Sequence, residues 1–156
     1  MAQIINGKDK YLTADAMAVD VGLFRSSIGN WNFTDDTGAV AVYPIFTITG
    51  DVYIEQLYGI CQDTLLGTGT VEVGIAGATA AIIAQVAGAA VTVGLLWQDA
   101  VPDAQPGVVT LLGRSWTLYN GTDINLTIAG AVLTAGDIEF YCNWRPLSLN
   151  GNLVAA

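Results

Sequence analysis

The chain has 156 residues, the size of one domain, and 53% of them are hydrophobic while 12% are charged. Fourteen acidic residues against five basic ones give a formal net charge of −9, so a phosphate backbone would repel the chain and we expect no nucleic-acid partner. The apolar runs are broken by Gly, Thr, Asp or Gln well before the roughly 18 residues that a membrane helix needs, so we expect a soluble chain with no membrane partner.

Histidine is absent, which removes the side chain that most often serves as a general base or as a metal ligand near neutral pH. The serines therefore have no imidazole to activate them as nucleophiles. We expect no enzymatic activity, no cofactor and no bound metal.

The two cysteines, Cys61 and Cys142, lie in segments predicted to be strands. We expect reduced thiols that pack as small apolar side chains. A disulfide between them would require neighbouring strands and an oxidising environment. Lys8 and Lys10 interrupt a short apolar start, so we expect no signal peptide and no export by the general secretory route.

Residues 1–40 differ from the rest of the chain because they show no sustained alternation, and we predict an extended N-terminal arm. Phe24, Trp31 and Phe33 are bulky apolar side chains set among Ser, Gly, Asn and Asp. Aromatic residues on such a chain either fold back onto their own domain or insert into a neighbour. Together with Trp97, at the end of a later predicted strand, they are the candidate assembly contacts.

Residues 41–61 (AVYPIFTITGDVYIEQLYGIC) give the clearest strand signal of the chain. Apolar and polar residues alternate on both sides of Gly50-Asp51, which predicts a β-hairpin with at least one buried face. Pro44 suggests that its first strand begins at a sheet edge. The same alternation recurs to the C-terminus, so we predict one all-β domain over residues 41–156.

Several further segments fit this all-β pattern. Val108–Leu112 and Ser115–Tyr119 predict a second hairpin, and the proline-containing segment 99–107 is predicted to be a loop. With about eight or nine short strands, the chain is predicted to form a jelly-roll-like β-sandwich. The other predicted strands are residues 71–76, 80–86, 95–97, 124–129 and 138–145, with one more short strand in the tail.

Carboxylates occur close together at three places, Asp35-Asp36, Asp99 with Asp103, and Asp137 with Glu139. A glycosidase needs two carboxylates across a cleft, whereas Asp137 and Glu139 are predicted to share the solvent side of a strand. We interpret all three groups as surface charge. A weak ion site near Asp99 and Asp103 stays open, because calcium prefers oxygen ligands.

Four segments (VYPIFTITGDVYIEQLYGIC, TVEVGIAGATAAIIAQ, LLWQDAVPDA and DIEFYCNWRPLSLNGNLVAA) give residues 41–156 a resemblance to head decoration, or cement, proteins of tailed bacteriophages. The resemblance implies a jelly-roll-like structural protein, commonly a homotrimer, on the outer surface of the virion head. It implies the major capsid protein as partner, with adjacent capsid subunits clamped against the internal pressure of the DNA.

Two other classes are considered. A receptor- or glycan-binding module of a phage fibre would use exposed aromatic rings such as Trp97, Trp116 or Tyr119 to stack on sugars. A carbohydrate-active enzyme would depend on Asp137 or Glu139, and the absence of a recognisable catalytic motif argues against it.

Overall fold

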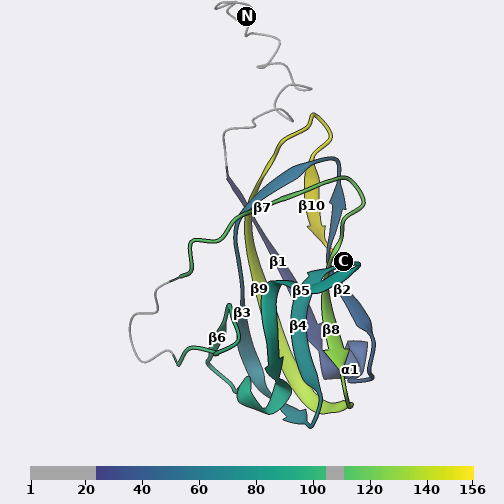
Figure 1. Cartoon of the computed structure of the whole chain (residues 1–156), viewed down its shortest axis with the longest axis vertical. Coiled ribbons are helices and arrows are strands. Elements are labelled where there is room, and N and C mark those ends of the chain that lie inside the picture. The colour runs from purple at the N-terminus through teal and green to yellow at the C-terminus, as the bar shows by residue number, and fades with distance from the viewer. Residues whose placement is uncertain (1–23, 105–110) are drawn as a thin grey trace, which may run out of the picture.

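The computed structural model describes residues 24–104 and 111–156, which form two antiparallel β-sheets packed face to face (Figure 1). Sheet A has the order β1-β9-β3-β6, with β7 also paired to β3, and sheet B has the order β10-β2-β8-β4-β5. This confirms the predicted all-β sandwich.

The strands of sheet A are β1 (Arg25–Asn32), β3 (Val52–Gly67), β6 (Leu96–Trp97), β7 (Trp116–Leu118) and β9 (Leu133–Pro146). Those of sheet B are β2 (Val42–Thr49), β4 (Thr70–Ile75), β5 (Ala78–Ala87), β8 (Ile124–Ala129) and β10 (Asn152–Ala155). The described helical elements are a one-turn helix, α1 (Phe33–Asp36), and a 3-10 turn, η3 (Gly88–Ala90). The strands predicted over residues 71–76, 80–86, 95–97, 124–129 and 138–145, and the one in the tail, are therefore confirmed as β4, β5, β6, β8, β9 and β10.

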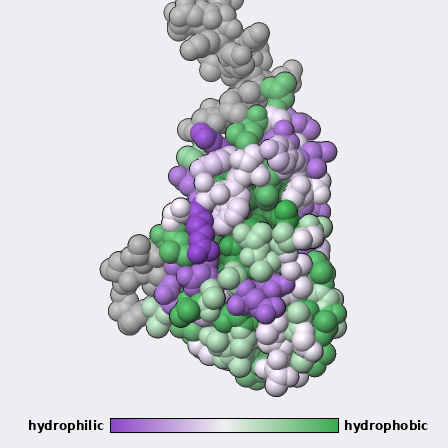
Figure 2. All heavy atoms as spheres, viewed as in Figure 1, coloured by the Kyte–Doolittle hydropathy of each residue, from purple (hydrophilic) through white to green (hydrophobic). Residues whose placement is uncertain are grey.

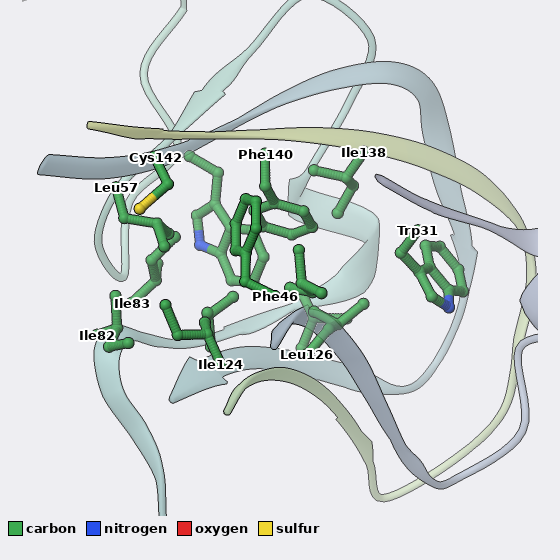
Figure 3. Packing of buried hydrophobic residues seen from close by; sticks show 14 of the residues in the cluster. Trp31, Phe46, Leu57, Ile82, Ile83, Ile124, Leu126, Ile138, Phe140 and Cys142 are labelled. Atoms are coloured by element: carbon green, nitrogen blue, oxygen red, sulfur yellow. The ribbon is translucent and has the colours of Figure 1, made fainter. Parts of the chain in front are cut away.

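The core lies between the sheets and is built from the residues of each strand that point inward (Figure 3). On β9 these are Ile138, Phe140, Cys142 and Trp144, while the residues between them face outward. Each large aliphatic or aromatic side chain removed from water contributes about 1.5–3 kcal/mol to stability. The alternation therefore selects which face of each strand is buried.

The predicted hairpin at Gly50-Asp51 is wrong, because its two strands lie in different sheets. β2 pairs with β10 and β8, whereas β3 pairs with β9, β6 and β7. Side chains of two other loops stabilise the Gly50-Asp51 connection. Gly50 N donates to Asn120 Oδ1 (2.8 Å) and Asp51 N donates to Ser148 Oγ (2.8 Å). Alternation shows that a strand has a buried face and says nothing about its neighbour, so a crossing between sheets fits the same pattern.

The second predicted hairpin is not seen in the described residues. Residues 108–110 lie outside them, residues 111–115 contain no strand, and Trp116–Leu118 forms β7 beside β3. Gly113-Arg114 therefore does not connect two paired strands. The described part of the predicted loop, residues 99–104, is irregular apart from a bridge between Leu96 and Asp103.

The first described strand of the sandwich begins at Arg25, within the segment predicted to be an arm (residues 1–40). β1 pairs with β9 over its whole length, and Trp31 on β1 is 1% exposed in the core. The sequence hid this strand because its inward positions include the small residues Ser27 and Gly29, which interrupt the apolar alternation. Residues 1–23 of the predicted arm lie outside the described residues.

Ser27 on β1 connects the two sheets through side-chain hydrogen bonds. Its hydroxyl donates to the carbonyl oxygen of Leu153 on β10 (3.2 Å) and accepts the indole N–H of Trp144 on β9 (2.9 Å). β1 is thus joined to both sheets, as an integral strand would be.

Substitution of Gly29 by Ala is expected to destabilise the domain. A Cβ there would lie 2.6 Å from Ile45 Cγ2 and 2.9 Å from the Ile45 carbonyl oxygen, closer than atoms pack without rearrangement. We expect a loss of about 1–3 kcal/mol in the free energy of unfolding, measured by urea denaturation. Gly113→Ala is the control, because a Cβ at Gly113 meets nothing within 4 Å. Equal stability of the two variants would contradict the packing of β1.

Candidate interaction surface

The outer face of sheet A is an ordered surface of aromatic, amide and charged side chains. The register of β1, β9 and β3 arranges it in cross-strand rows, because partners on neighbouring strands project to the same side. The rows, from one end to the other, are Arg145 and Tyr53, with Phe24 beside them just before β1; Ser26, Asn143 and Gln56; Ile28, Tyr141 and Tyr58; Asn30, Glu139 and Ile60; and Asn32, Asp137 and Asp63.

A cation that contacts two neighbouring rings occupies the first row, since the rings of Phe24 and Tyr53 have centres 6.4 Å apart. The guanidinium carbon of Arg145 lies 4.9 Å from the ring centre of Tyr53 and 5.4 Å from that of Phe24. Such contacts hold an arginine flat while leaving its edge available to an acceptor. The Arg145 Nε itself is buried without a hydrogen-bond partner among the described residues.

The middle row forms an apolar centre. The rings of Tyr58 and Tyr141 stack with centres 5.4 Å apart and an interplanar angle of 13°, and Ile28, 51% exposed, is the register partner of Tyr141 on its other side. The Tyr141 hydroxyl donates to Glu139 Oε2 (2.5 Å). This hydrogen bond to a carboxylate raises the pKa of Tyr141, because ionisation would lose the donor.

Carboxylates gather at the opposite end of the face. Asp137 accepts from Asn30 Nδ2 (2.7 Å), and Glu139 accepts from Gln62 Nε2 (3.2 Å). Asp63 and Asp137 are direct register partners on β3 and β9. The helix α1 adds Asp35 and Asp36 near this end.

The outer face of sheet B has a different character. β4 and β5 lie in front of β9 in Figure 1, and the same view in Figure 2 shows pale and green surface over these strands with small hydrophilic groups between. The exposed positions of β5 are Ala78, Ala80, Ala81, Gln85 and Ala87. Tyrosine and arginine are enriched in protein interfaces while alanine is depleted, so sheet A presents the stronger candidate surface.

Of the four predicted assembly contacts, two are buried in the core and two are exposed. Trp31 and Trp97 are core residues, with Trp97 fully buried beside Phe140 (ring centres 6.3 Å apart). They are therefore not available to a partner in this fold. Phe24 is 46% exposed at the first row of the outer face, and Phe33, also exposed, begins α1.

Sequence reasoning did not single out Ile28, Tyr58, Tyr141 or Arg145 as a surface. The signal for Tyr141 and Arg145 was present, since they alternate with the buried residues of β9. The alternation does not reveal that β9 pairs with β1 and β3. This pairing brings Ile28 and Tyr58 beside Tyr141.

The three aromatic residues proposed for sugar stacking do not form a platform. Trp97 is buried, Trp116 packs partly against the core, and Tyr119 is 67% exposed. The Asp99 and Asp103 carboxylates accept hydrogen bonds from Val101 N and Gln98 Nε2, respectively. In the described part of the chain, no three His, Cys, Asp or Glu side chains gather closely enough to hold a metal ion.

Both cysteines are free and buried, as predicted. Burial raises the pKa of the Cys61 thiol to about 11 and that of Cys142 to about 12. Both thiols are thus protonated near neutral pH, and a protonated thiol is a poor nucleophile. Within residues 24–104 and 111–156, no helix is long and apolar enough to cross a membrane.

The comparisons with known proteins show a likeness of fold. No protein-family model matches the chain, and no curated protein matches it. Among solved structures, the chain is similar to a chain of the "Cyanophage Pam1 capsid asymmetric unit", with a TM-score of 0.51 and 18% sequence identity. The alignment covers 81% of this chain and 87% of that chain, so it spans most of the sandwich.

The stability of the domain is expected to fall at alkaline pH. The folded-state pKa of Cys142, about 12, lies above the ordinary thiol value of 9.0. The protonated thiol therefore adds stability below pH 9 that is lost as the pH rises from 9 toward 12, with a slope of at most about 1.4 kcal/mol per pH unit. Urea unfolding at pH 8 and pH 10.5 should show a smaller decrease for Cys142→Ala than for the wild type. Equal decreases would contradict the burial of this thiol.

Proposed function

We propose that this protein is a structural component of a phage virion, a decoration or cement protein that binds the outside of the capsid. In this proposal it stabilises contacts between major capsid subunits, binds without catalysing a reaction, and assembles with copies of itself, as a homotrimer in the arrangement that the family resemblance implies. The observation that carries the proposal is the fold likeness to a chain of a cyanophage capsid asymmetric unit over most of both chains.

The surface of the sandwich supports a role in assembly. The outer face of sheet A combines three tyrosines and an arginine, which are residue types that dominate binding energy in protein interfaces, with the exposed side chains of Phe24 and Ile28. Many weak contacts of this kind, repeated over a shell, give a stable assembly because each bound copy raises the effective concentration of the next contact.

The arm hypothesis is retained in a narrower form. Phe24 and Phe33 are exposed, whereas Trp31 belongs to the core. Because β1 begins at Arg25, deletion of residues 1–40 would remove a strand of sheet A. Deletion of residues 1–23 is the appropriate test, since it leaves every described residue in place.

Purified virions that carry this protein should contain it in proportion to the major capsid protein. Quantitative mass spectrometry of the particles measures this ratio, and a density map of the intact particle shows whether the chain lies on the outside of the head. A receptor-binding module of a fibre would be present in only a few copies and would bind on a glycan array. Absence of the chain from the head would contradict the proposal.

Deletion of residues 1–23 is expected to abolish binding to capsids that lack the protein, while the midpoint of urea unfolding stays unchanged. The physical reason is that the shortened chain keeps β1 (Arg25–Asn32) and every described strand pairing. Co-sedimentation with capsids measures the binding. Full binding by the shortened chain would show that the arm is not needed and would leave the folded domain as the contact.

A further inference from the structure

Opposite charges lie at the two ends of the outer face of sheet A, with a cation at one end of the strands and carboxylates at the other. Arg145 and Asp137 lie near the two ends of β9, about 27 Å apart at the usual rise of a strand. Asp63, the register partner of Asp137, adds a second carboxylate to the acidic end. The apolar row of Ile28, Tyr141 and Tyr58 lies midway between the two ends.

Neither end is neutralised within the described part of the chain. Arg145 contacts the rings of Phe24 and Tyr53, and its Nε has no hydrogen-bond partner there. Asp137 accepts from the neutral amide of Asn30. Carboxylates placed directly opposite each other on neighbouring strands repel, so Asp63 and Asp137 would gain from a cation between them.

The order of the outward residues on β9 makes the face complementary to itself. Read along the strand, they are Arg145, Asn143, Tyr141, Glu139 and Asp137. A two-fold axis in the plane of contact, perpendicular to the strands and passing at Tyr141, places Arg145 of one copy over Asp137 of the other. It also places Asn143 over Glu139, so that an amide donor meets a carboxylate, and Tyr141 over its own equivalent.

The flanking strands follow the same symmetry. Tyr53 on β3 of one copy lies over Asp63 on β3 of the other copy. Ile28 and Tyr58 each lie over the same residue of the other copy. The contact would have an apolar centre and a charged rim, which is the usual anatomy of a protein interface. An axis parallel to the strands would instead place like charges over each other, so charge selects the antiparallel arrangement.

We propose that the outer face of sheet A is an isologous contact between two copies of this chain. The inference goes beyond the proposed function and does not depend on it. A two-fold contact is also compatible with a trimer, because it can join one trimer to the next. The occupant is a second copy because this face supplies both members of each charge pair, which matters for a chain of net charge −9.

Charge reversal tests the contact in the full-length protein. Arg145→Glu would place a carboxylate over Asp137 twice in each pair of molecules, and we expect the dissociation constant for self-association to rise about tenfold or more. Arg114→Glu, in the segment before β7, is the matched control with the same change in net charge, and it should leave the constant unchanged. Sedimentation velocity over a concentration series, at low and at high salt, measures it.

The double variant Arg145→Asp with Asp137→Arg separates a lost contact from a damaged fold. Exchanging the charges restores both pairs across the two-fold axis, so self-association should return toward the wild-type value. Asp137→Arg alone should weaken association as Arg145→Glu does. Urea unfolding of each variant reports any loss of stability from the ring contacts of Arg145.

A cross-link at the axis tests the geometry directly. Opposed sheets lie about 10 Å apart, which is too far for a disulfide but within reach of a short bifunctional maleimide. Tyr141→Cys should give a covalent dimer, whereas the wild type, whose cysteines are buried, and a variant with the new thiol on sheet B, Ala81→Cys, should not.

The proposal is overturned by a wild-type association that Arg145→Glu leaves unchanged, by a double variant that associates no better than the single ones, or by absence of the Tyr141→Cys cross-link. A chain that stays monomeric while Arg145→Glu abolishes its binding to capsids would assign the face to the capsid instead. Retained capsid binding by a non-associating variant would leave the proposed function intact.

Discussion

The register of β9 is the constraint on which the rest of the structure depends. This strand lies between β1 and β3, and it presents Phe140 and Trp144 to the core while it presents Tyr141 and Arg145 to the outside. A slip of one residue would exchange the two sets. The core and the candidate interaction surface are therefore fixed by one alignment, and the apolar residues that bury well determine which polar residues are displayed.

Strand existence could be predicted from the sequence far better than strand pairing. Residues 124–129 and 138–145 alternate strictly, and both are strands. The same pattern at residues 41–61 predicted a hairpin, yet β2 and β3 lie in opposite sheets. Because each strand of a sandwich buries one face against the same core, alternation is satisfied by either connection, and only the long-range partners decide between them.

The interaction surface was less predictable than the fold, for a related reason. Aromatic residues drew attention as single side chains, and two of them, Trp31 and Trp97, proved to be core. The surface consists of residues that are ordinary alone, such as Ile28 and Tyr58, and become a patch when three strands come together. β1 was missed because Ser27 and Gly29 take inward positions, where close contact with Ile45 and Leu153 requires small side chains.

The closure of the sandwich by β1 has a consequence for how the chain acquires its structure during synthesis. Ser27 accepts the indole N–H of Trp144, a residue 117 positions later, and every pairing of β1 is with β9. A ribosome must therefore release the chain through β9 (Leu133–Pro146) before the first described strand can pair with its neighbour. Until then the edges of β1 and β3 that pair with β9 are unpaired. Nascent chains close together on one mRNA could pair at these edges and aggregate. We expect the pairing of β1 with β9 to be a slow, late step of folding.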